Sequence, residues 1–314
     1  MKLLTACAVA LALIPACGRN EKQSPAPVGA TAPAPPPRAS AEPAKPPQEK
    51  DTEAPEPDHP PGAVPFDYPA VSTTAKKGDY VLAPSKNWIA EAFEKGGGTQ
   101  TFIYYGGWML DPGDKASTVK TLTGITSTIP NAMVIPVPSG GTAEPGDILL
   151  TTWQSGSGMQ RAIVVEGGKP DRPEVRYLDL ALDNPSGWGK QVDTLKPHTF
   201  VKLDRTGQVG TSVACKVGER RTRWVITNLA GDKLLAIGFA GRMRVFQRKD
   251  CADLPIKPKL RAGDKLMVPL VDGYAEGQVE KIDAAIGRVW ARYSFGGKDK
   301  ERAFAFTNVA RKLQ

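Results

Sequence analysis

Histidine and cysteine are scarce in this sequence, which has 2 histidines and 4 cysteines among 314 residues. His198 is the single histidine after residue 65, whereas a hydrolytic triad needs an imidazole base beside its nucleophile. The sequence also has no Gly-x-Ser-x-Gly elbow, no phosphate-binding Gly-x-x-x-x-Gly-Lys loop and no zinc-protease helix. One histidine and two cysteines that we expect to bond to each other do not make a zinc site. We therefore expect no metal, no cofactor and no enzyme activity.

Long hydrophobic runs are absent outside the first sixteen residues. Lys2 is followed by an apolar run from Leu3 to Ile14, and then by Pro15 and Ala16 just before Cys17. This layout is typical of a signal peptide, and the run is shorter than the roughly 18 residues that a membrane-spanning helix needs. We expect residues 1–16 to be a signal peptide that is removed on export.

The letters LIPAC that end at Cys17 resemble the lipobox of bacterial lipoproteins, although Ile14 and Pro15 depart modestly from its preferred residues. The resemblance implies that Cys17 becomes the first residue of the mature chain and carries lipid. A rival match that ends at Cys7 has too few apolar residues before it to serve as an export signal. Gly18 stands where an aspartate would retain a Gram-negative lipoprotein in the inner membrane, which favours the outer membrane. The alternative is an ordinary signal peptide and a soluble secreted protein.

Two cysteines, Cys215 and Cys251, remain for the folded part of the chain. An isolated pair in an oxidising compartment is expected to form a disulfide. Such a bond would stabilise the fold by roughly 3 to 4 kcal/mol on the chain-entropy model. The alternative is two free buried thiols.

Large apolar residues are almost absent between Gly18 and Pro65, where 14 of the 29 prolines lie. Such a composition cannot bury enough surface to fold, so we expect residues 17–65 to be a lipidated, disordered tether. The tether and signal together contain 6 of the 41 Lys and Arg residues and 7 of the 33 Asp and Glu residues, which leaves 35 and 26, a net charge of +9, in residues 66–314.

Short segments that are rich in β-branched and aromatic residues and bounded by Gly, Pro, Asp or Asn dominate the rest of the chain. The best helical candidate is Trp88 to Lys95, about two turns before three glycines. An all-β fold is predicted. A Gly-Asp pair followed by an apolar run recurs at Gly78, Gly146, Gly231 and Gly263, and we interpret it as the opening of a barrel strand.

Residues 261–313 resemble Tudor and agenet-type modules, which are SH3-like barrels. The matching residues are Gly263, Asp264, Asp272, Gly273, Tyr274, Val279, Ile282, Trp290 and Tyr293. The resemblance is looser over 144–203 and covers only the opening of 76–138. It implies two or three small barrels: one or two within 66–206, a disulfide-closed basic β-hairpin region at 207–256, and a C-terminal barrel at 257–314. It also implies an aromatic ligand cage at Tyr274, Trp290 and Tyr293, with Trp290 as a core residue as the alternative.

The segment between the two cysteines is strongly basic, with nine Lys or Arg residues against three Asp or Glu residues. Arg242 and Arg244 alternate with Met243 and Val245, so a strand would place both arginines on one face. The candidate residues for a polyanion-binding face are Arg220, Arg221, Arg223, Trp224, Arg242, Arg244 and Arg248. A scattered, solvated basic surface is the alternative.

These features predict a membrane-anchored protein of the cell envelope that binds an anionic envelope polymer or a partner protein, with no nucleic acid involved. A scaffold for envelope assembly is the first alternative, and a carboxylate-based cell-wall hydrolase is the second. For the hydrolase, Asp179 and Asp183 would lie about 13 Å apart on a strand, which is beyond the usual separation of catalytic carboxylate pairs.

Overall fold

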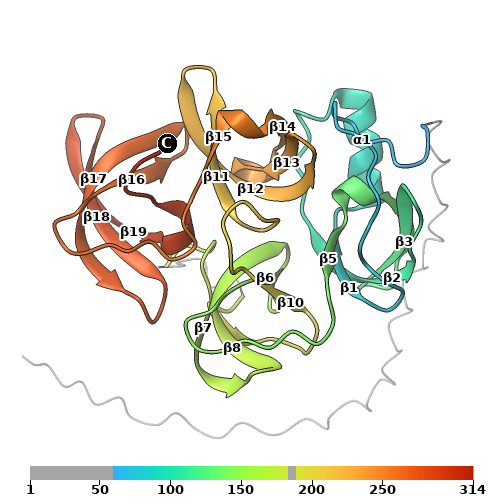
Figure 1. Ribbon diagram of the computed structural model, residues 1–314, viewed down its shortest axis with the longest axis horizontal. Helices are drawn as coiled ribbons and strands as arrows, with labels where there is room; N and C mark the ends of the chain where they lie inside the picture. Colours follow the sequence, from blue (N-terminus) through green and yellow to red (C-terminus); the bar gives the residue numbers. More distant parts are fainter. Residues whose placement is uncertain (1–58, 183–188, 314) are drawn as a thin grey trace, which may run out of the picture. The chain divides into compact units, whose positions relative to one another are not determined.

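The computed structural model describes residues 59–182 and 189–313. Within these residues, nineteen strands form four antiparallel sheets, and there is one α-helix (Figure 1). The predicted all-β class is confirmed. The predicted signal peptide, Cys17 and the tether as far as residue 58 lie outside the described residues.

The first sheet has the strand order β4-β3-β2-β1-β5. Its strands are β1 (Tyr80–Ala83), β2 (Tyr105–Asp111), β3 (Ala116–Thr121), β4 (Thr126–Pro130) and β5 (Ile135–Val137). The helix α1 (Lys86–Lys95) lies between β1 and β2 in the chain and ends at Gly96, whose φ of 87° favours glycine. The predicted short helix before the three glycines is therefore present.

The second and third sheets have the strand orders β10-β6-β7-β8-β9 and β14-β13-β12-β11-β15. As in the first sheet, the first strand in the chain lies between the second strand and the last. The second consists of β6 (Ile148–Thr152), β7 (Met159–Lys169), β8 (Arg172–Tyr177), β9 (Val192–Thr194) and β10 (Phe200–Lys202). The third consists of β11 (Ser212–Val217), β12 (Arg220–Ala230), β13 (Lys233–Ile237), β14 (Met243–Gln247) and β15 (Cys251–Asp253).

The fourth sheet is the meander β16-β17-β18-β19. Its strands are β16 (Lys265–Leu270), β17 (Gly273–Asp283), β18 (Arg288–Phe295) and β19 (Lys298–Ala305). A 3-10 helical turn at Phe306–Asn308 follows, and Ala310 then forms a bridge to Met267 on β16.

All four sheets share one topology, in which the chain returns at the end of each sheet to pair with its first strand. β5 pairs with β1, β10 with β6 and β15 with β11, while the Ala310 bridge takes this place in the fourth sheet. The sequence predicts two or three SH3-like barrels in residues 66–314, and this finer prediction is wrong, because the structure contains four small antiparallel sheets there.

A glycine turn precedes the first strand of each sheet. In three sheets the amide of Gly78, Gly146 or Gly263 donates a hydrogen bond to a carbonyl of the second strand, as the recurring Gly-Asp pair predicts. The Gly-Asp pair at Gly231 instead occupies the hairpin between β12 and β13. The equivalent turn of the third sheet uses Gly210, whose amide donates to the Ile226 carbonyl.

The largest cluster of buried apolar side chains draws on all four sheets, and it includes Leu82 on β1, Ile163 on β7, Leu235 on β13 and Ala305 on β19. Each of the second, third and fourth sheets also has a cluster of its own. Packing begins before residue 66, because Val64 is buried and the His59 ring stacks on Phe93 at 3.8 Å between centroids. The sheets therefore share part of their core.

Candidate functional site

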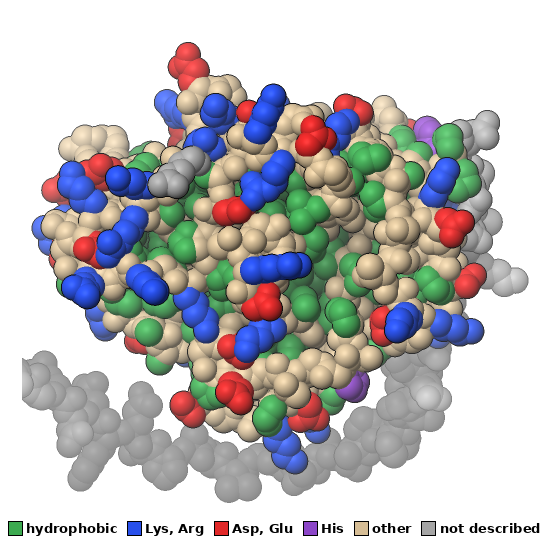
Figure 2. Space-filling view, in the orientation of Figure 1, with side chains coloured by type: hydrophobic (Ala, Val, Ile, Leu, Met, Phe, Trp, Pro, Cys, Tyr) green, Lys and Arg blue, Asp and Glu red, His purple; other side chains and the backbone are tan. Residues whose placement is uncertain are grey.

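The basic residues of the third sheet do not gather on one face. Arg221 and Arg223 lie opposite Lys216 and Ala214 in the register of β12, whereas Arg244 on β14 lies opposite Ala236, which itself lies opposite Ile226. Because alternate residues face opposite sides of a strand, Arg223 and Arg244 point to different faces. Figure 2 likewise shows Lys and Arg side chains distributed among Asp and Glu over the whole visible face.

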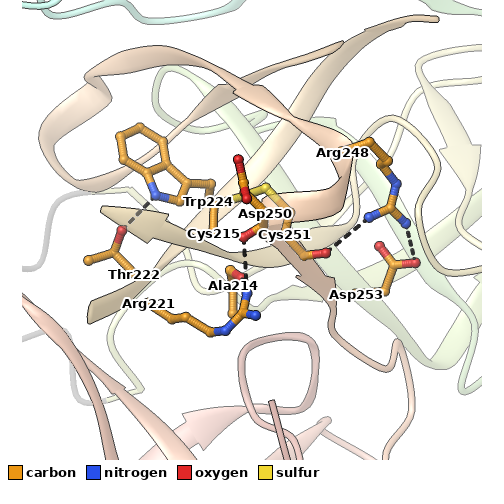
Figure 3. Close-up of a disulfide and its surroundings, with 9 residues drawn as sticks. All are labelled: Ala214, Cys215, Arg221, Thr222, Trp224, Arg248, Asp250, Cys251 and Asp253. Carbon is orange, nitrogen blue, oxygen red and sulfur yellow. Dashed lines mark hydrogen bonds and ion pairs between the residues drawn. A yellow bond between two sulfur atoms is a disulfide. The ribbon is translucent and has the colours of Figure 1, made fainter. Parts of the chain in front are cut away.

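Most of the predicted arginines already bind groups of the protein itself. Arg220 donates to Asp272 of the fourth sheet at 2.6 Å, and Arg242 donates to the Gly98 carbonyl near the first sheet at 3.2 Å. Arg221 donates to the carbonyls of Ala214 and Asp250, and Arg248 donates to Asp253 and to the Cys251 carbonyl (Figure 3). Arg244 is exposed, with its guanidinium 5.6 Å from the centroid of the Phe246 ring. Apart from Arg244, these arginines therefore connect strands and sheets within the protein.

The four predicted aromatic residues take part in separate contacts. Trp224 donates its indole N–H to Thr222 and packs edge-on against Phe246. Tyr293 is 8% exposed and packs on Phe304, while the Lys281 ammonium lies 4.9 Å from the centroid of the Trp290 ring. Tyr274 donates its hydroxyl to the Asn308 carbonyl at 3.3 Å, and burial raises the pKa of this phenol.

Cys215 on β11 lies directly opposite Cys251 on β15, and the two sulfur atoms are 2.00 Å apart (Figure 3). Both side chains belong to the buried cluster of the third sheet. The two sulfur atoms therefore lie between the first and last strands of that sheet, at the distance of a disulfide.

A buried polar cluster connects the second, third and fourth sheets, and we call it the Arg161 junction. Arg161 on β7 is 1% exposed and donates its backbone N–H and its Nε–H to Asp179 Oδ2, at 2.8 and 3.0 Å. Its terminal nitrogens donate to Asp179 Oδ1, to the Ser212 hydroxyl and to Asn308 Oδ1. Arg223 on β12 completes the junction, with Nη1 3.4 Å from Asn308 Oδ1 and 3.8 Å from Asp179 Oδ1.

The Arg161 junction carries an excess of positive charge. Burial alone would raise the pKa of Asp179, but the charge and hydrogen bonds of Arg161 outweigh burial and hold this pKa below its ordinary value. Burial, together with the charge of Arg161, lowers the pKa of Arg223. Burial also lowers the pKa of the neighbouring Arg288, which donates to the carbonyls of Tyr177 and Leu180, to about 10. One ionised aspartate thus faces several cations, and it is poorly suited to act as a general acid.

A cavity of about 570 Å³ lies beside the junction, with Arg223 and Asp179 in its wall. Its other walls come from the segment before β2, the start of β7 and the turn between β13 and β14. Figure 2 shows hydrophobic side chains in a hollow near the middle of the visible face.

A second concave region, which we call the basic groove, lies between the end of β15 and the C-terminal segment. It has a volume of about 720 Å³ and is lined by Lys257, Lys259, Arg311 and Lys312. Asp253 is the one acidic residue in its lining, and Arg248 already neutralises it through a 2.6 Å ion pair. Both Lys259 and Lys312 are exposed and, among the described residues, have no ion-pair partner. The groove therefore presents unpaired positive charge to solvent.

The sequence predictions missed both the junction and the groove. A signal for the junction exists, since Arg161 precedes the apolar run Ala162 to Val165 and Asp179 lies between Leu178 and Leu180, where an unpaired charge would be costly. The groove has no comparable signal because its two basic pairs lie about fifty positions apart in the chain.

Of the residues considered for catalysis or metal binding, His198 makes a hydrogen bond within the fold and Asp183 lies outside the described residues. His198 Nδ1 accepts a hydrogen bond from the Gly140 amide at 2.9 Å, and its backbone has a φ of 63°. Within the described ranges, no three His, Cys, Asp or Glu side chains are grouped so that they could hold a metal ion.

Comparison with protein-family models gives no match, and a search of curated proteins also finds no significant match. Among the helices of residues 59–182 and 189–313, none has the length and apolar character needed to cross a membrane.

Proposed function

We propose that this chain is a lipid-anchored protein of the bacterial cell envelope whose folded part binds an anionic envelope polymer without catalysing a reaction. The observation that carries the proposal is the basic groove, where Lys259 and Lys312 have no ion-pair partner among the described residues. The other two cations of the lining, Lys257 and Arg311, form ion pairs with Asp147 and Asp264, and Arg248 neutralises the single acidic residue of the lining. Phosphate, sulfate or carboxylate groups would bind these side chains through charge-assisted hydrogen bonds. The excess of nine positive charges in residues 66–314 would add long-range attraction.

We further propose that the four small sheets act as four similar binding modules. The support is the shared strand order, in which the first strand pairs with both the second and the last. Binding would use the surfaces of these modules and the junctions between them.

The proposed anchor is a lipid on Cys17 that holds the protein in the outer membrane. Replacement of Cys17 by alanine is expected to abolish incorporation of labelled palmitate and to move the protein from the membrane to the soluble fraction, because the acyl chains on Cys17 are the proposed anchor. Cys7→Ala is the matched control and should change neither result. An unmodified Cys17 in the native protein, detected by mass spectrometry, would contradict the proposal.

The groove is tested by reversing two of its charges. The variant Lys257→Glu with Lys259→Glu is expected to bind heparin or lipopolysaccharide at least about tenfold more weakly at 0.15 M salt, since two charge-assisted contacts become repulsive. Affinity can be measured by surface plasmon resonance at several salt concentrations, where screening should weaken the binding of the native protein.

The matched control is Lys216→Glu with Lys249→Glu, which makes the same change in charge at exposed positions of the third sheet. It should lose much less affinity than the groove variant. Equal losses in the two variants would mean that only the overall charge matters, and the groove would not be the binding site.

A further inference from the structure

We propose that the cavity beside the Arg161 junction binds a small amphiphilic molecule with one anionic head group, and that this group forms an ion pair with the Arg223 guanidinium. This site is distinct from the basic groove, so the proposal does not depend on the binding of a polymer.

The lining of the cavity is mostly apolar. It includes Phe102, Ile103 and Tyr104 in the segment before β2, Met159 on β7, and Val225 and Ile237 of the third sheet. A volume of about 570 Å³ lies in the range of sites for small organic ligands, which are typically apolar with a few polar groups that fix orientation. The apolar part of a ligand therefore has a surface to contact.

Arg223 is the cation in this lining, and its hydrogen-bonding capacity is largely unused. A guanidinium has five N–H donors, and among the described residues Arg223 makes one hydrogen bond, the 3.4 Å contact with Asn308 Oδ1. Arg161, in contrast, donates to both oxygens of Asp179 and to two further side chains. The side chain of Arg223 is 28% exposed, so the remaining donors can be reached from the cavity.

The charge of the junction favours an anion over a neutral ligand. Asp179 is already bound by Arg161, and its Oδ1 lies 3.8 Å from Arg223, beyond hydrogen-bond distance. A carboxylate or sulfonate in the cavity would give Arg223 a direct partner in a partly buried place, where such pairs are stronger than on the surface. Because one guanidinium is available, the ligand has one anionic group.

Two fluorescent probes that differ in charge test the proposal. Anilinonaphthalene sulfonate carries an anionic group, and N-phenylnaphthylamine is its neutral counterpart without the sulfonate. The native protein should bind both probes. Arg223→Gln is expected to weaken binding of the sulfonate at least about tenfold and to change binding of the neutral probe less than twofold.

Three further variants keep the result interpretable. Arg223→Lys retains the charge and should lose less affinity for the sulfonate than Arg223→Gln does. Val225→Trp should fill the cavity and weaken the binding of both probes. Arg244→Gln removes an exposed arginine on the other face and should leave both affinities unchanged. Urea unfolding of each variant identifies any loss of folding.

The proposal is overturned if Arg223→Gln binds the sulfonate as tightly as the native protein does, or if it weakens both probes equally. It is also overturned if Val225→Trp remains folded and binds both probes normally. Heparin affinity should be unchanged in Arg223→Gln, so failure of this site and failure of the basic groove are distinguishable.

Discussion

Replacement of Asp179 by asparagine is expected to lower the free energy of unfolding by about 3 to 5 kcal/mol, because it leaves Arg161 charged and buried without a counterion. Arg161 is 1% exposed and donates three of its hydrogen bonds to the Asp179 carboxylate. The same cluster joins the second, third and fourth sheets through Ser212 and Asn308. Urea unfolding followed by circular dichroism measures the loss.

Acid titration gives an independent check on the same carboxylate. The folded-state pKa of Asp179 lies below its unfolded value of about 3.9, so its ionic contribution is fully present above that value and is lost as the pH falls through the folded-state pKa. The Asp179→Asn variant should therefore lose less stability than the native protein between about pH 5 and pH 2. Asp299→Asn, at an exposed position of β19, should behave like the native protein in both experiments.

The β-sheet class was predictable because the strands are local and their turns are visible in the sequence. In β8, for example, Pro173, Val175 and Tyr177 are buried and alternate with less buried residues, as a half-buried strand requires. The number of sheets was not predictable in the same way. The Gly-Asp pair at Gly231 has the letters of a sheet opening but lies in a hairpin, while Gly210-Thr211 opens the third sheet without an aspartate.

The contacts of the predicted arginines could not be foreseen, because their partners are distant in the sequence. Arg242 binds a carbonyl 144 positions away, and Arg161 binds Asn308, which is 147 positions away. Charge density along the chain identified a basic segment but could not distinguish cations that face solvent from cations that join sheets. The sequence feature that indicates a sheet-joining cation is a single charge next to an apolar run, such as Arg161, rather than a cluster of charges.

Reduction of the Cys215–Cys251 pair is expected to lower the free energy of unfolding by roughly 3 to 4 kcal/mol on the chain-entropy model, since the pair closes a loop with a sequence separation of 36. The loss should appear as a lower urea midpoint in the presence of a reductant. Cys251 lies on β15, a strand of three residues that pairs only with β11 in the sheet order, so reduction should loosen this strand first. Hydrogen exchange at β15 should then increase more than at β12, which lies inside the sheet.

The matched variant carries Cys215→Ala and Cys251→Ala together, and its unfolding should not respond to the reductant. Because the two side chains are 0% and 8% exposed, reduction of the native protein should be slow without urea and fast once the third sheet opens. Alkylation of protein purified without reductant and then denatured should label neither cysteine. Labelling of both cysteines, together with unfolding that is the same with and without reductant, would mean that the protein carries two free thiols. The third sheet would then be stabilised by its packing and strand pairing alone.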